Sequence, residues 1–314
     1  MRDIADASSR RDSIARPAPA KAIAAAAVLL AATAAIVRAN DDDKGGPKQN
    51  TFKVDTEHIF GFTEGADIGE VGDREFEKET GARFGRRMGL YAASSTLFDF
   101  KYVPLPGVLI SPGVLLSYHG ISSVPGLDDR QQIAFQGLSF EVKYQLLDRN
   151  HAPFGLTLFA QPRWTRIDEA TGERVSQFGG EFTLALDREI LPERLFGAIN
   201  LIYEPEISRS HETGEQERES TIGISAGLAA QLLPGFLIGA ETRYLRAHEG
   251  LIPGALKGDA LFVGPTLYTR LSPDTFMSVA WNAQIAGHAS GEPGRLDLTN
   301  FDRHRVRFRL GLEF

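Results

Sequence analysis

Residues 305–314 read Arg-Val-Arg-Phe-Arg-Leu-Gly-Leu-Glu-Phe, and this stretch decides the fold class. Every second residue from Val306 to Phe314 is apolar, and most of the residues between them are charged. Because successive side chains of a strand point to opposite faces, the stretch predicts a strand with one apolar and one charged face. A length of about ten residues is what a tilted strand needs to cross a bilayer. The stretch therefore favours a transmembrane β-barrel, while a soluble sheet with one face in water remains an alternative.

Similar alternation continues back to residue 55 and predicts an all-β chain of about twelve strands. The expected strands are 55–66, 88–102, 106–119, 132–146, 151–166, 174–189, 193–208, 216–231, 235–248, 258–271, 275–288 and 303–314. Residues 74–84 (REFEKETGARF) also alternate, but they are too charged for lipid contact, so we interpret them as an extension of the second strand outside the membrane. An even number of strands places both ends of the barrel chain on the same side.

The connections between these strands alternate in length. Short connections at 104–107, 148–151, 191–193, 233–235 and 272–274 mostly carry Pro, Gly or Asp, as turns require. Longer ones lie at 121–131, 167–174, 210–219, 249–257 and 289–302. Short periplasmic turns and longer outer loops are typical of closed antiparallel outer-membrane barrels. A soluble β-sandwich does not explain this alternation together with an export signal and a terminal Phe.

The N-terminal residues predict export from the cytoplasm. Basic residues precede an apolar stretch from Ala22 to Val37, and Val37-Arg38-Ala39 provides a small-residue cleavage site, so we expect residues 1–39 to be a signal peptide. Residues 40–54 are polar and begin with an acidic run, which predicts a flexible periplasmic lead-in. The barrel itself is then expected over 55–314.

Composition excludes several classes of protein. The chain has no Cys, which excludes thiol chemistry and Cys-ligated metal sites, and after residue 40 it has no apolar run long enough for a transmembrane helix. The formal net charge is −7, and loss of residues 1–39 removes more basic than acidic side chains, which argues against a nucleic-acid partner.

An amphipathic last strand that closes on a C-terminal Phe resembles bacterial outer-membrane β-barrel proteins of the porin or channel kind. The resemblance implies a Gram-negative outer membrane as the location, with membrane lipid around the wall. It also implies that the final apolar residues are an assembly signal for the barrel-assembly machinery. Those residues are Phe308, Leu310, Leu312 and Phe314.

The face of the strands opposite the apolar one carries charges of both signs, which we expect to line the lumen. They are Asp99, Lys101, Glu141, Lys143, Arg163, Glu181, Asp187, Glu204, Glu241, Arg243, Arg270, Arg307, Arg309 and Glu313. Unpaired buried charge is costly, so most of these groups should pair with one another. They either line a path for a small polar solute or form a charged filling that keeps the barrel rigid, and the two roles are compatible.

The sequence gives little support for catalysis or for metal binding. The His residues lack metal-ligand spacing, no phosphate-binding loop is present, and we expect no cofactor. His119 and Ser122, at the outer end of a strand, are the one pair to weigh for a rim lipid hydrolase, but no orienting group is evident near them. The sequence favours a narrow channel or transporter for small polar solutes. The alternative is a non-conducting structural or surface-interaction barrel, and an outer-membrane lipid hydrolase is less favoured.

Overall fold

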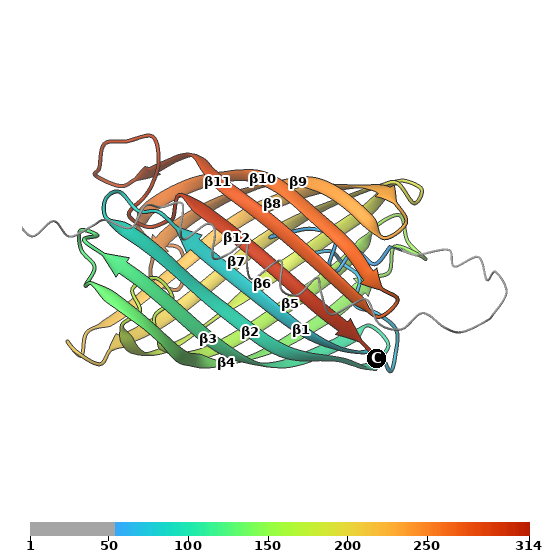
Figure 1. The fold of residues 1–314 in the computed structure, drawn as a ribbon, viewed down its shortest axis with the longest axis horizontal. Helices are drawn as coiled ribbons and strands as arrows, with labels where there is room; N and C mark the ends of the chain where they lie inside the picture. The colour runs from blue at the N-terminus through green and yellow to red at the C-terminus, as the bar shows by residue number, and fades with distance from the viewer. Residues whose placement is uncertain (1–53) are drawn as a thin grey trace, which may run out of the picture. The chain divides into compact units, whose positions relative to one another are not determined.

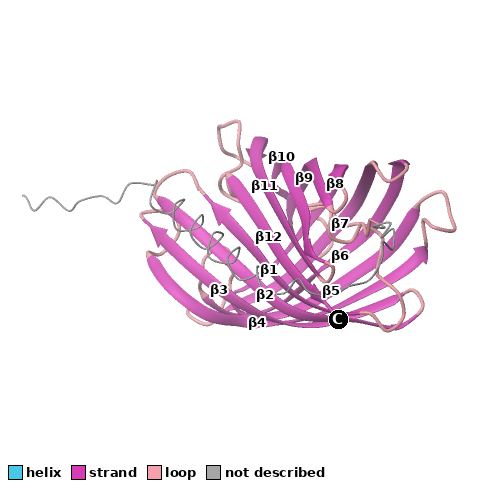
Figure 2. Ribbon diagram, turned by 45° about the vertical axis from the view of Figure 1, so that its right-hand side comes forward, coloured by secondary structure: helices cyan, strands magenta, loops and turns pink. Residues whose placement is uncertain are grey.

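The structure, a computed structural model, describes residues 54–314, so the predicted signal peptide and all but the last residue of the lead-in lie outside the described residues. The described chain consists of strands and loops (Figure 2). Twelve strands follow one another: β1 Arg74–Phe84, β2 Leu90–Leu105, β3 Val108–Ser122, β4 Arg130–Leu147, β5 Gly155–Ile167, β6 Arg174–Leu191, β7 Leu195–Ser210, β8 Gln216–Leu233, β9 Phe236–Glu249, β10 Leu256–Ser272, β11 Thr275–Ala289 and β12 His304–Glu313. Between residues 54 and 314, no helix is long and apolar enough to span a membrane.

Each strand pairs antiparallel with the next, and β12 pairs with β1 to close a barrel (Figure 1). The closing register runs from Glu75 opposite Glu313 to Phe84 opposite His304. Closure leaves no strand edge unpaired. An unpaired edge in lipid would be costly, because its backbone N–H and C=O groups would have no hydrogen-bond partners. The prediction of a closed antiparallel barrel of about twelve strands is confirmed.

The two faces of the wall differ as the alternation predicts. On β4, Leu138 and Phe140 are exposed on the outside, whereas Ser139 and Glu141, which alternate with them, are buried on the lumen side. The other strands repeat this arrangement, and their exposed apolar side chains cover the outer surface. Examples are Val114, Leu116, Leu158, Phe182, Ile199, Leu201, Ile224, Leu228, Ile238, Val263 and Leu312.

The two ends of the barrel differ in their connections. One end, which we call the turn end, holds the C-terminus and the connections 106–107, 148–154, 192–194, 234–235 and 273–274. The other, the loop end, holds 85–89, 123–129, 168–173, 211–215, 250–255 and 290–303. The predicted alternation is therefore present with one exception, because 148–154 is longer than several loops. The strand predicted from residue 151 begins only at Gly155.

The first predicted strand is wrong. Residues 55–66 form no strand, and the strand that completes the barrel is β1, the stretch interpreted as an extension outside the membrane. The total is still twelve strands, because β1 takes the place of the strand predicted over 55–66. In β1, Glu75 and Glu77 are buried toward the lumen while Phe76 lies exposed between them. The charge of this stretch is thus concentrated on the face that avoids lipid.

Residues 54–68, which we call the plug, fill the lumen at the turn end; Figure 1 draws them in blue near the C-terminus. Ile59 and Phe60 each expose only 1% of their surface. Two adjacent residues that are both buried do not fit a strand of a barrel wall, where one of them would face outward. With Val54 they pack against inward residues of β7–β11, namely Phe196, Ala198, Ala229, Leu237, Tyr268 and Phe276.

Lumen side chains bind the backbone of the plug directly. The Glu241 carboxylate on β9 accepts hydrogen bonds from the backbone N–H of Phe62, at 3.0 and 2.8 Å, and of Thr63, at 3.0 Å. Asn200 on β7 accepts from the N–H of Glu64 at 2.7 Å and donates to its carbonyl oxygen at 2.8 Å. These bonds satisfy backbone groups that have no strand partner.

A second set of bonds holds the two ends of the plug together. Asp187 on β6 accepts hydrogen bonds from the hydroxyl of Thr56 and, at 3.0 Å, from the N–H of Ala66. Arg149, in the long connection 148–154, forms ion pairs with Asp67 at 2.6 Å and Asp187 at 3.4 Å. The unusual length of this connection brings a guanidinium group under the plug.

The loop end is narrowed by loops that fold inward. Phe301 of loop 290–303 packs against Phe262 on β10, with 6.3 Å between ring centroids. Val124 and Leu127 of loop 123–129 pack against Tyr91 on β2. The lumen is thus filled at one end by the plug and constricted at the other.

We predict that Gly61→Ala loosens the plug and leaves the barrel closed. A Cβ at residue 61 would overlap the Cβ of Ala280 and lie 2.6 Å from Oε1 of Glu241, and overpacking of this kind costs about 1–3 kcal/mol. Endoproteinase Glu-C should then cleave the folded barrel after Glu57 and Glu64 roughly 5- to 100-fold faster than the wild type.

The matched control is Gly81→Ala, because a Cβ there meets no atom within 4 Å. Both variants should keep the heat-dependent shift in gel mobility that closed barrels show. Equal cleavage of Gly61→Ala and wild type would contradict the tight packing of the plug.

Candidate functional site

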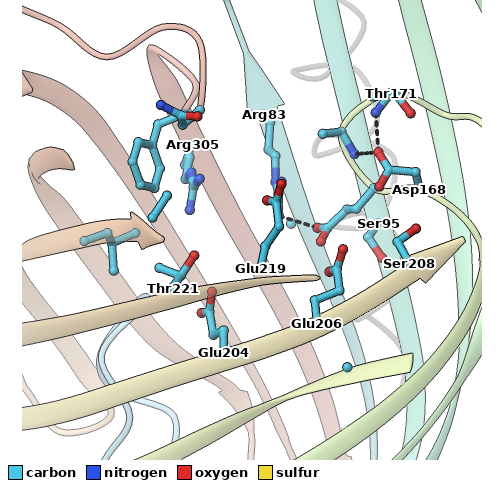
Figure 3. Close-up of a pocket in the computed structure, with 18 of the residues that line it drawn as sticks. Arg83, Ser95, Asp168, Thr171, Glu204, Glu206, Ser208, Glu219, Thr221 and Arg305 are labelled. Carbon is cyan, nitrogen blue, oxygen red and sulfur yellow. Dashed lines mark hydrogen bonds and ion pairs between the residues drawn. The ribbon is translucent and has the colours of Figure 1, made fainter. Parts of the chain in front are cut away.

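A cavity of about 830 Å³, which we call the vestibule, lies between the plug and the inward-folded loops. Phe62 of the plug is part of its lining, and loop residues such as Leu127, Asp168 and Phe301 line it on the loop side. The wall between them carries charged residues of both signs (Figure 3). Such a cavity can hold a small polar molecule within the barrel.

One part of the vestibule wall is basic, and most of its cations are paired. Arg83 on β1 binds Glu169 of loop 168–173 at 2.7 Å, and Asp302 lies 3.6 Å from Arg305 on β12. Burial raises the pKa of the Glu169 carboxyl, but the nearby guanidinium groups of Arg83, Arg163 and Arg305 together lower it by more, so the net pKa lies below its usual range. Loop 168–173 is therefore held over the vestibule by a charged contact.

The facing part of the wall is acidic. Glu204 and Glu206 project from β7, and Glu219 projects from β8 (Figure 3). Glu219 forms an ion pair with Lys257. The side chain of Glu204 has neither a hydrogen bond nor an ion pair with any residue in the range 54–314. Carboxylates of β7 and β8 thus face guanidinium groups of β1 and β12 across the vestibule.

At the base of the vestibule, the ring of Phe62 contacts two guanidinium groups. The Cζ atom of Arg243 lies 4.8 Å from the ring centroid and that of Arg307 lies 4.9 Å from it. Cation–π contacts of this kind hold a ring in place more strongly when they are removed from water. Phe62 thus joins the plug to β9 and β12 where the vestibule ends.

Below the vestibule, the ammonium group of Lys101 contacts three carboxylates, and the ring of His58 lies near the same three. Nζ of Lys101 on β2 lies 3.0 Å from Glu57 of the plug, 3.2 Å from Glu75 and 3.0 Å from Glu77 on β1. All four side chains are buried. Charge is thus compensated locally, as a low-dielectric interior requires.

The plug carboxylates have further wall partners. Glu57 also binds Lys143 on β4 at 2.8 Å, and Glu64 binds Arg307 at 3.0 Å and Arg309 at 2.6 Å. The plug is therefore amphipathic: its apolar side packs on β7–β11 and its acidic side meets cations of β2, β4 and β12.

Two groups of side chains have the donor types of a metal site, namely Asp55 with Glu57 and His58, and His58 with Glu75 and Glu77. The ammonium of Lys101 already contacts three of these carboxylates. A divalent cation would have to share their charge with this ammonium, so the residues do not fit a metal ion well, and we assign none.

The predicted lumen charges fall into three sets. Those lining the vestibule are Arg163, Glu181, Glu204, Arg243 and Arg307. Those buried around the plug are Asp99, Lys101, Glu141, Lys143, Asp187, Glu241 and Arg309. Arg270 and Glu313 pair with each other at 2.8 Å at the turn end.

The expectation that these groups pair mainly with one another is only partly met. Glu241 and Asp187 bind the plug backbone. The carboxylates that pair with Arg307 and Arg309 are Glu64 of the plug and Glu79 of β1. Glu79 lies 3.4 Å from Arg307 and 2.7 Å from Arg309. Neither Glu64 nor Glu79 was among the predicted lumen charges. The alternation within residues 74–84 was the signal that could have revealed Glu79.

His119 and Ser122, the pair considered for lipid hydrolysis, do not contact each other. The Nε2 atom of buried His119 lies 3.1 Å from the carbonyl oxygen of Glu169, and the Ser122 hydroxyl lies 3.5 Å from Asp129. Within the described chain, no hydrogen bond joins His119 to Ser122. Their geometry therefore provides no nucleophile and base.

The barrel, its apolar outer face and its charged lumen have the architecture of an outer-membrane β-barrel. The sequence profile of DUF6662, a family of unknown function, matches residues 52–314, and the chain belongs to this family. No curated protein matches the chain.

Solved structures share the fold. The COG4313 outer membrane channel from Pseudomonas putida F1 is 13% identical with a TM-score of 0.53, over 79% of this chain and 98% of that one. The NanC porin is 12% identical with a TM-score of 0.46, over 76% and 98%. At these identities the comparison with the P. putida channel establishes the fold alone.

We predict that Lys101→Gln destabilises the barrel strongly. The substitution leaves Glu57, Glu75 and Glu77 buried together, and loss of one partner from a buried charge cluster costs about 3–5 kcal/mol. The free energy of unfolding in urea, measured in lipid vesicles, should fall by this amount. Lys78→Gln serves as the control, because Lys78 on the neighbouring strand forms no ion pair within the described chain. An effect no greater than that of the control would argue against the role of Lys101.

Proposed function

We propose that this protein is an outer-membrane channel for small polar solutes, closed at its periplasmic end by the plug. In this proposal the loop end faces the outside of the cell and the turn end faces the periplasm. A signal peptide directs export, and the apolar outer face lies in membrane lipid. The observation that carries the proposal is the vestibule of about 830 Å³, a charged cavity enclosed by a barrel wall.

The width of the barrel agrees with a narrow path. A barrel of twelve strands is only moderately wider than eight-stranded barrels, which side chains fill, and much narrower than sixteen-stranded porins. The plug and the paired charges occupy much of that space. Solutes must therefore be small, and passage requires the plug to move.

The bonding of the plug is compatible with such movement. Each wall cation that binds the plug also binds a carboxylate of the wall: Lys101 binds Glu75 and Glu77, Lys143 binds Glu141, and Arg307 and Arg309 bind Glu79. When the plug leaves, these cations keep a partner, so the lumen loses part of its charge compensation rather than all of it.

A second function has one observation in its favour. The plug buries most of its side chains and is bound from several sides, as expected of a barrel that never conducts. In that case the protein is a structural or surface-interaction barrel. Electrical recording separates the two functions.

We predict that wild-type protein in planar bilayers shows low conductance with brief openings. Glu57→Gln combined with Glu64→Gln should raise the open fraction at least about tenfold, because it removes the ion pairs of these two plug carboxylates with the wall cations, while the pairs within the wall remain. Glu70→Gln is the matched control, because this carboxylate is exposed. Large steady currents in the wild type would refute the closed plug, and silence in the double variant would favour the non-conducting barrel.

We also propose that the C-terminal residues Phe308 to Phe314 direct assembly. Phe314 exposes 67% of its surface, and its ring lies 6.0 Å from that of Phe100 on β2, across the seam between the first and last strands. Phe314→Ser should reduce the amount of barrel in the outer membrane several-fold, measured by fractionation and gel shift. Leu232→Ser, at an exposed turn-end position of β8, is the control. Equal amounts of both variants would remove the special role of Phe314.

A further inference from the structure

Arg243 differs from every other cation that lines the vestibule. It is 94% buried, since it exposes 6% of its surface, yet its Nε and Nη1 atoms have no hydrogen-bond partner. Within residues 54–314 its guanidinium forms no ion pair, and it lies over the face of the Phe62 ring. The other vestibule cations are Arg83, Arg86, Arg87, Arg163, Lys257, Arg305 and Arg307, and each has a carboxylate partner.

A buried guanidinium without an acceptor is costly, because its hydrogen bonds to water are not replaced. Arg243 lines the vestibule, so an acceptor can reach it from there. A carboxylate matches it best, because the planar donors of Arg bind both oxygens of a carboxylate together.

Glu204 supplies the opposite charge. It lines the same vestibule and is only half-buried, and its carboxylate has no hydrogen bond or ion pair within the described residues. It interacts with Arg243 electrostatically, but the two groups are too far apart for an ion pair. A purely anionic solute at Arg243 would therefore meet repulsion from Glu204, and a purely cationic solute at Glu204 would meet repulsion from Arg243.

The register of the strands fixes the spacing between the two groups. Glu204 lies opposite Thr221 on β8, and Arg243 lies opposite Ser225 on the same strand. Their backbones are thus roughly 13 Å apart along β8 and about 10 Å apart across the sheet. The two charged groups stand at the ends of long side chains and still interact electrostatically, which is compatible with a solute that joins them through a short carbon chain.

The surface between them is apolar. Leu245, which follows Arg243 on the inward face of β9, is 1% exposed and lines the vestibule together with Phe62. Gly223, on β8 between Thr221 and Ser225, leaves room for the Leu245 side chain, because a Cβ there would lie 2.5 Å from Cδ2 of Leu245. A hydrocarbon segment fits this surface.

We propose that the vestibule binds dipolar solutes that carry a carboxylate and an ammonium group on a short carbon chain. The carboxylate binds Arg243, the ammonium binds Glu204, and the chain lies against Leu245 and Phe62. This inference names the solute class of the proposed channel and rests on that function for its biological meaning. The binding itself is measured independently of conduction.

The test uses isothermal titration calorimetry of the full mature barrel in detergent with three matched probes: ε-aminocaproate, caproate and hexylamine. The wild type should bind ε-aminocaproate at least about tenfold more tightly than either probe with a single charge. Equal affinity for caproate, or no heat of binding for ε-aminocaproate at millimolar concentration, overturns the proposal.

Variants assign the two ends of the solute. Arg243→Gln should reduce the affinity for ε-aminocaproate to that for hexylamine, and Glu204→Gln should reduce it to that for caproate. Arg209→Gln is the control, because Arg209 on β7 is exposed and does not line the vestibule. Retained preference for ε-aminocaproate in both site variants refutes the assignment. If a variant fails the gel-shift test of folding, the probe series on the wild type still decides.

The outcomes separate this inference from the proposed function. Binding without current in any variant sustains the site and refutes the channel. Current without selective binding sustains the channel and refutes the dipolar site.

Discussion

The buried ion pairs between the plug and the wall are the interaction on which the closed lumen depends. Glu57 and Glu64 bring two negative charges into a space where the wall already carries paired carboxylates and cations. Their partners are Lys101, Lys143, Arg307 and Arg309. Because a low-dielectric interior penalises any uncompensated charge, the wall cations and the plug carboxylates constrain one another. The closed state therefore depends on charge balance as well as on apolar packing.

Most of the fold could be predicted from the sequence, because each barrel strand records its own two faces. Alternation identified eleven of the strands, and the connection lengths identified the two ends. Residues 74–84 were misassigned because their charges were judged together and not by face. Residues 55–66 were misassigned because Ile59 and Phe60 look like strand residues, and nothing local shows that both pack inside a lumen.

The site was less accessible from sequence. Alternation placed Arg243 and Glu204 on the inward face, because the side-chain period of a strand is local information. It could not assign partners, since these come from strands and segments far apart in the chain. Glu241 shows the difference. Its inward position was predictable, but its hydrogen bonds to the backbone of Phe62 and Thr63 depend on a segment inside the lumen that is not a strand of the wall.

The plug precedes β1 in the chain, yet its contacts lie on strands from β2 to β12. The plug is thus made before any strand of the wall, yet its complete binding surface exists only once β12 has joined β1. Until then its carboxylates stay in water and its apolar residues have no complete cavity to enter. Complete docking of residues 54–68 therefore depends on closure of the barrel, because the strands that hold the plug are joined around it only when the seam between β1 and β12 has formed.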